Sequence, residues 1–131
     1  MLDYPMEIIK NNNIKFVPAS HENPLDPGCL KKVLLRRDDI DPGRIQMINW
    51  SLLLKNKSFE KHYHEDMLEI FIIISNQATI IVDDKKEIMT KGDTVIIAPN
   101  EIHQMINETN EDTEYIAIGI AYGTTGKTIN V

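Results

Sequence analysis

The feature that most constrains the fold is a series of short apolar runs, rich in Ile and Val, that begins near residue 30 and continues almost to the end of the chain. Turn-forming residues separate these runs, for example at 38–43, 55–58 and 82–87. No run has the length and period of an amphipathic helix, so each predicts a β-strand. A string of short antiparallel strands exposes its edges unless it closes on itself, which favours a β-barrel or jelly roll.

The strands are expected at residues 31–37, 44–54, 67–75, 78–83, 86–90, 93–99, 102–107 and 113–122. Residues 1–29, rich in Asn and Pro, predict an N-terminal arm with at most short strands. Residues 30–131 are expected to form a single domain, since a chain of 131 residues is long enough for one hydrophobic core and too short for two. The end of the chain predicts a loop followed by a last short strand.

Composition excludes several classes of function. A formal net charge of −6 disfavours a broad basic surface, so no nucleic-acid partner is expected. No apolar stretch approaches the roughly 18 residues of a membrane helix, and residues 1–13 lack the pattern of a signal peptide. A cytoplasmic protein without a membrane partner is therefore expected. The single cysteine, Cys29, excludes an internal disulfide and a multi-thiolate metal site, and it predicts a half-buried apolar residue rather than a nucleophile.

Metal-binding residue types gather in the segment HYHEDMLE at 62–69. His62 and His64 stand at i and i+2, which point to the same face of a strand. A turn after His64 would return Glu69 on the neighbouring strand, so that two imidazoles and a carboxylate converge. This is the 2-His-1-carboxylate pattern, which leaves open positions on a metal ion. A third imidazole is available from His103.

The two segments around these residues resemble the two motifs of the cupin superfamily, G-x5-H-x-H-x3,4-E-x6-G and G-x5-P-x-G-x2-H-x3-N. The matching positions are His62, His64, Glu69, Gly92, His103 and Asn107. The resemblance extends over roughly residues 50–110 and leaves all four ligand positions intact. It implies a jelly-roll barrel of the cupin type that binds one divalent metal ion through His62, His64, Glu69 and His103.

The chain departs from the motifs at turn positions. Asn56, Asn76 and Asn100 stand where the motifs have glycine, and Ala98 stands at the proline position, with Pro99 directly after it. Asn adopts positive φ more readily than other non-glycine residues. The turns are therefore expected to persist.

Three neutral imidazoles and one carboxylate leave a divalent ion with a net charge of about +1, which favours anionic ligands. Nitrogen and oxygen ligands suit Mn, Fe, Ni, Co, Cu or Zn. Within the superfamily, the sequence resembles the mannose-6-phosphate-isomerase-like cupins. The resemblance implies a metalloenzyme that acts on a small oxygenated metabolite. Cupin activities include isomerase, lyase, decarboxylase and dioxygenase chemistry. The alternative is a non-catalytic cupin module that binds a small molecule.

Further expectations concern the surroundings of the metal. Alternation places Phe71 and Ile73 beyond Glu69, and Met105 beyond His103, on the same cavity wall, which would make it largely apolar. His21 is expected to be a solvated loop residue. Small cupins pair through sheet edges and terminal strands, so the resemblance implies a homodimer to which the arm contributes a strand.

Overall fold

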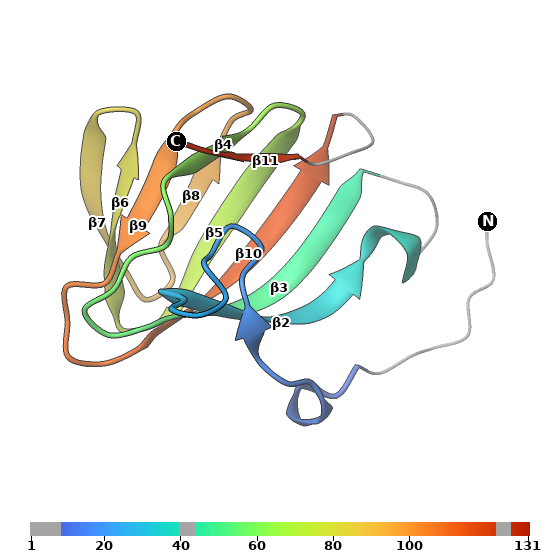
Figure 1. Ribbon diagram of the computed structural model, residues 1–131, viewed down its shortest axis with the longest axis horizontal. Helices are drawn as coiled ribbons and strands as arrows, with labels where there is room; N and C mark the ends of the chain where they lie inside the picture. The colour runs from blue at the N-terminus through green and yellow to red at the C-terminus, as the bar shows by residue number, and fades with distance from the viewer. Residues whose placement is uncertain (1–8, 40–43, 123–126) are drawn as a thin grey trace.

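The computed structural model describes residues 9–39, 44–122 and 127–131. Its regular secondary structure is almost entirely β, in two antiparallel sheets that face each other (Figure 1). The six-stranded sheet has the order β1 (Val17–Pro18), β2 (Cys29–Arg36), β3 (Ile45–Leu53), β10 (Thr113–Ala121), β5 (Met67–Ser75) and β8 (Thr94–Ile97). The five-stranded sheet has the order β11 (Thr128–Asn130), β4 (His62–His64), β9 (His103–Ile106), β6 (Gln77–Val82) and β7 (Lys85–Thr90).

The all-β jelly roll expected from the sequence is confirmed. Each predicted run contains a strand, and two one-turn 3-10 helices, η1 (Asn11–Asn13) and η2 (Arg37–Asp39), lie beside the sheets. Within the described ranges no ladder joins the two sheets, so the fold consists of two facing layers rather than one continuous barrel. The arm strand β1 pairs with β2 of the same chain. The boundary between an arm at residues 1–29 and a domain at residues 30–131 stays a prediction.

The core lies between the sheets because side chains alternate along the strands. On β5 and β10 every second residue is buried, and the residues between them are half-buried on the outer face. The inner face of β5 carries Met67, Glu69, Phe71 and Ile73. An apolar core with one carboxylate on the same strand therefore follows from the alternation in MLEIFIIIS.

The turns at the three asparagines keep the backbone that glycine would adopt. Asn56, Asn76 and Asn100 have φ of 56°, 61° and 69°, and Gly92 has φ of 88°. These values lie in or near the left-handed region, which Asn tolerates through its short polar side chain. The expectation that the Gly-to-Asn exchanges preserve the turns is confirmed.

Candidate metal centre

Three strands bring the four predicted ligands together. His62 and His64 project from one face of β4, Glu69 from β5 and His103 from β9. All four are buried, and their candidate ligand atoms lie within 4.8 Å of one another. His62 and His103 are direct cross-strand partners, which fixes their imidazoles side by side. The cluster can hold one metal ion.

The sequence-based expectation for Glu69 is corrected in one respect. Strand β4 pairs with β9 and β11, whereas β5 pairs with β10 and β8 in the other sheet. The turn at Glu65 and Asp66 therefore carries the chain across the core instead of forming a hairpin. Glu69 faces the imidazoles from the opposite sheet, because a jelly roll closes its ends by strands that change layers.

Each imidazole is oriented through its Nδ1 atom. Nδ1 of His62 lies 2.5 Å from the carbonyl oxygen of Glu60, and Nδ1 of His103 lies 2.9 Å from that of Glu101. A carbonyl only accepts, so both Nδ1 atoms carry the proton and both Nε2 atoms face the cluster. Nδ1 of His64 is 3.1 Å from Oγ1 of Thr128 on β11. Such outer contacts fix ring orientation at metal sites.

The contacts at Glu69 indicate where a cation fits. Its Oε1 lies 2.9 Å from Nε2 of His64 and 3.0 Å from Nε2 of His103. Burial raises the pKa of Glu69, but the hydrogen bonds from His103 and His64 outweigh it and hold the pKa below its usual range. Both ring nitrogens of His103 lie beside oxygen acceptors. A neutral imidazole has only one N–H, which Nδ1 donates, so its Nε2 lone pair faces the carboxylate of Glu69. A cation between Nε2 and the carboxylate satisfies both groups. A divalent ion bound by three nitrogens and one oxygen fits this donor set.

The pKa of His62 is lowered to about 3, because burial disfavours the charged ring and because His21 and His103 lie close by. The imidazole is therefore neutral at physiological pH. A neutral ring with its proton on Nδ1 has the Nε2 lone pair that a metal ligand needs.

A cavity of about 170 Å³ opens beside the cluster and is lined by His64, Glu69 and Phe71 among others. This volume is below the range of about 300–1,000 Å³ for drug-sized ligands, so it suits a small metabolite. Of the three residues predicted to line it, only Phe71 does. Ile73 and Met105 are packed in the core, 1% and 0% exposed, where they belong to the buried cluster between the sheets.

The expectation of a largely apolar cavity agrees with most of its lining, which includes Met47, Met67, Phe71, Tyr115 and Ala117. Alternation did not predict the polar part of the wall, on β2, β3 and the segment before β2, which is formed by Ser20, Lys31, Gln46, Asn49 and Ser51. Alternation from the metal ligands identified only the part of the wall on β5. The polar residues come from strands distant in sequence, which only the sheet order brings beside the ligands.

His21 was expected to be solvated, but the structure places it against the four candidate metal ligands. Its side chain is 15% exposed, and its ring stacks on that of His62 with 4.4 Å between centroids. It also lines the cavity. The one local signal was the adjacent acidic residue, because Oε2 of Glu22 accepts from Nδ1 of His21 at 2.8 Å.

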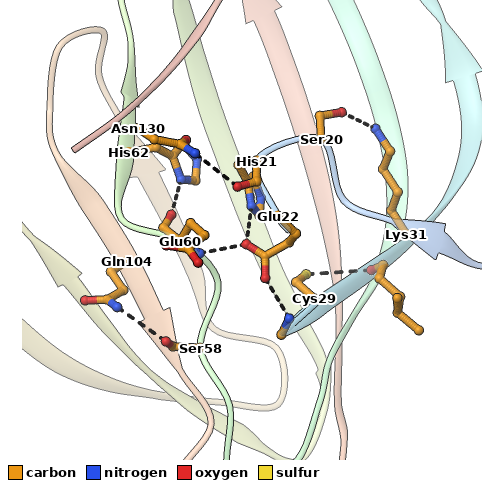
Figure 2. Close-up of polar contacts among 12 residues, drawn as sticks. Ser20, His21, Glu22, Cys29, Lys31, Ser58, Glu60, His62, Gln104 and Asn130 are labelled. Atoms are coloured by element: carbon orange, nitrogen blue, oxygen red, sulfur yellow. Dashed lines mark hydrogen bonds and ion pairs between the residues drawn. The ribbon is translucent and has the colours of Figure 1, made fainter. Parts of the chain in front are cut away.

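The carboxylate of Glu22 joins the segment 19–28 to the backbone just before β4 (Figure 2). Besides His21, it accepts from the backbone N–H groups of Gly28 and Glu60, each at 2.7 Å. Burial raises the pKa of Glu22, but the hydrogen bonds from His21 and Glu60 lower it further than burial raises it. One ionised side chain thus joins the segment before β2 to the approach of β4.

Cys29 is fully buried rather than half-buried, and its Sγ lies 3.2 Å from Oη of Tyr115. Burial raises the pKa of its thiol to about 12. A thiol protonated at neutral pH is a poor nucleophile and a poor metal ligand. The expectation of a non-nucleophilic residue agrees with this environment.

The sequence profile of the cupin domain matches residues 50–119, more than half of the chain and the part that holds all four clustered residues. The chain is a cupin. No curated protein matches the sequence of this cupin. Within its described residues, no helix is long and apolar enough to cross a membrane.

Solved structures show the same fold. The polyketide cyclase RemF from Streptomyces resistomycificus superposes with a TM-score of 0.78 at 16% identity, covering 97% of this cupin and 86% of the cyclase. A predicted oxalate decarboxylase from Thermotoga maritima gives 0.75 at 20% identity, covering 88% and 99%. A sugar phosphate isomerase from Silicibacter pomeroyi gives 0.71 at 16% identity, covering 87% and 75%.

Proposed function

We propose that this cupin is a metalloenzyme that uses one divalent metal ion, held by His62, His64, Glu69 and His103, to act on a small oxygenated anionic metabolite. The observation that carries the proposal is the buried set of three oriented imidazoles and one carboxylate beside a small cavity. Isomerase, lyase, decarboxylase or dioxygenase chemistry suits such a site. The structures that share the fold include proteins named for cyclase, decarboxylase and isomerase activities.

The chain's own residues would hold and orient the ion. The carbonyls of Glu60 and Glu101 keep two Nε2 atoms directed at the cluster, and Glu69 supplies the one negative charge. A bound divalent ion supplies Lewis acidity or, if it is iron, oxygen activation. The net charge of about +1 on the loaded site attracts an anion, and the small cavity limits its size.

We also propose that the chain forms a homodimer through the outer face of the six-stranded sheet. The half-buried residues on this face include Ile48, Trp50, Ile70, Ile72, Ile116 and Ile118. Ile116 is the cross-strand partner of both Trp50 and Ile72, so the apolar side chains are contiguous over β3, β10 and β5. A contiguous apolar face of this kind is typical of a subunit interface, and a second copy of the chain offers a matching one.

The test of the metal site is elemental analysis of protein purified without added metal and without chelator. We expect about one equivalent of Mn, Fe, Ni, Co, Cu or Zn in the wild type and almost none in Glu69→Gln or in His62→Ala/His64→Ala, because each change removes ligands from a single site. His21→Ala is the matched control. It removes an imidazole that contacts His62 but lies outside the ligand cluster, so metal content is expected to persist.

Equal and negligible metal in all four proteins would contradict the metalloenzyme proposal and favour a metal-free binding module. If metal is present, small hydroxy-acids and oxo-acids are incubated with the loaded wild type and with Glu69→Gln. Turnover by the wild type that is lost in the variant supports an enzyme. Tight binding without turnover favours the module.

A further inference from the structure

Lys31 has an uncommon position for a lysine. It follows the fully buried Cys29 by two residues on β2, and its cross-strand partner on β3 is Ser51, which is 4% exposed. Since side chains alternate along a strand, Lys31 projects from the inner face of the six-stranded sheet, where it lines the cavity. A lysine on an inward face is rare unless a carboxylate pairs with it.

The ammonium of Lys31 has no such partner in the described part of the chain. It donates to Oγ of the exposed Ser20 at 2.6 Å (Figure 2). No Asp or Glu of the described ranges lies within ion-pair distance. Burial lowers the pKa of Lys31, and the charge of Arg36 acts in the same direction. An ammonium has three N–H donors, so donors are left for a ligand.

Strand register places Lys31 and Glu69 at opposite ends of a diagonal across the inner face. Lys31 pairs with Ser51, and Asn49 lies two residues from Ser51 on the same face of β3. Across β10, Asn49 is the partner of Ala117, and Gly119 is the partner of Glu69. The side chains of Met47 and Met67 pack over Gly119, and the cavity beside them touches Lys31, Asn49, Ala117 and Glu69.

Asn49 indicates independently that a polar ligand belongs in this space. It is 7% exposed, yet among the described residues its Oδ1 has no hydrogen-bond partner, and its Nδ2 makes a 3.5 Å contact with Sδ of Met47. An unpaired buried acceptor is costly, so such groups are rare in folded proteins outside functional sites. The amide torsion is soft, which allows the group to turn toward a ligand.

We propose that Lys31 is a specificity-determining residue that selects metabolites with a second oxyanion group, such as a carboxylate, at the end remote from the metal. The proposal rests on the metal-dependent function above. One end of the ligand meets the metal beside Glu69, its middle passes Asn49 and Ala117, and its far end accepts from the ammonium at the cavity mouth. The substrate class is thus a small linear dianion rather than a monoanion.

The test compares matched acids on the Mn²⁺-loaded protein by isothermal titration calorimetry, after elemental analysis has verified loading. Succinate, glutarate, adipate and pimelate are each paired with the monocarboxylate of the same chain length. We expect the wild type to bind at least one dicarboxylate about tenfold more tightly than its partner, because a charge-assisted hydrogen bond in a half-buried site is strong enough for that ratio.

Lys31→Met approximates the length of the side chain and removes its charge, so the ratio of dicarboxylate to monocarboxylate affinity should fall to about one, with the larger loss on the dicarboxylate. Lys86→Met, on the exposed face of β7, is the matched control for the loss of one positive charge, and it should retain the preference. A purely structural role for Lys31 would lower the unfolding temperature of Lys31→Met without changing the ratio of the two affinities.

The proposal is overturned if Lys31→Met keeps the preference, or if the wild type binds monocarboxylates at the metal and shows no preference for any dicarboxylate. A wild-type protein that takes up none of Mn, Fe, Ni, Co, Cu and Zn would instead refute the proposed metal-dependent function. Elemental analysis separates this result from the others before any acid is titrated.

Discussion

Two buried asparagines differ in how fully the fold satisfies their amide groups. Asn107 is fully buried, and its side chain donates to the carbonyls of Leu53 and Glu111 and accepts from the backbone and side chain of Thr109. Asn49 is almost as buried, and its Oδ1 beside the cavity finds no hydrogen-bond partner in the part of the chain that the structure describes. The amide of Asn107 therefore stabilises the end of a strand, whereas the Oδ1 of Asn49 is an acceptor that remains open to a ligand.

Replacing Asn49 with leucine is expected to stabilise the metal-free protein by about 1 kcal/mol, because the change replaces an unsatisfied buried acceptor with an apolar side chain of the same branched shape. Thermal unfolding followed by circular dichroism measures it. Asn107→Leu is the matched control and should destabilise by about 2 kcal/mol or more, since it leaves several partners unpaired. A lower unfolding temperature for Asn49→Leu would show that Asn49 supports the fold and not a ligand.

At the scale of elements, short connections decide where the ligand strands end. The backbone N–H of Asn100 donates to the carbonyl of His64, which ties the turn before β9 to the end of β4. The segment 19–28 is held in turn by Glu22, which reaches the approach to β4 from the other side. Both connections position histidines of the candidate metal site, and residues 19–21 of the second connection also line the cavity.

Asn100→Ala is expected to destabilise the protein by about 1 kcal/mol, because alanine resists the φ of 69° that the turn requires. Asn100→Gly is the matched variant and should be close to neutral, since glycine adopts this backbone freely. Urea unfolding of the three proteins measures the difference. Equal losses for alanine and glycine would mean that the side chain of Asn100, rather than its backbone, is what the turn needs.

Glu22→Gln is expected to destabilise by about 1–3 kcal/mol at neutral pH, because one carboxylate that accepts three N–H donors becomes an amide with a single acceptor. The folded-state pKa of Glu22 is lowered, so its contribution is present above the unfolded pKa and is lost as the pH falls through the folded one. The difference from wild type should therefore shrink on acidification.

Hydrogen exchange of the Gly28 and Glu60 amides should accelerate in Glu22→Gln, since both N–H groups donate to this carboxylate. Glu87→Gln, on the exposed face of β7, is the control for loss of a carboxylate alone. A stability difference that persists unchanged at strongly acidic pH would contradict the role assigned to the ionised Glu22.

At the scale of the whole molecule, the six-stranded sheet has two different faces. Its inner face holds the cavity and Glu69, and its outer face presents half-buried isoleucines over β3, β10 and β5. The apolar outer face explains why the run at 67–75 lacks the clean apolar–polar alternation of a sheet with one solvated side.

Sedimentation equilibrium is expected to give twice the 15.0 kDa mass of the chain at micromolar concentration. Ile118→Glu should shift the protein to a single chain, because it places a charge in the centre of the proposed interface. Ile88→Glu is the matched control, since Ile88 is 61% exposed on β7 and lies outside that face. A single-chain mass for the wild type would refute the dimer.

The strands and the four residues of the candidate metal site could be predicted from the sequence. Strand positions follow from local alternation and turn chemistry, and the spacing of His62, His64 and Glu69 is a local pattern as well. The tolerance of Asn at positive φ likewise depends on one residue and its backbone, so the turns at Asn56 and Asn76 were also predictable.

The sheet that each strand joins could not be read from the sequence, because it depends on long-range strand pairing. The residues that line the cavity depend on the same pairing. Glu69 proved to face the histidines across the core, His21 came from the distant segment 19–28, and Lys31 and Asn49 formed the polar wall. These residues meet through pairings between strands far apart in the chain. Local alternation states which face of a strand a side chain occupies, but only the long-range register states what lies opposite.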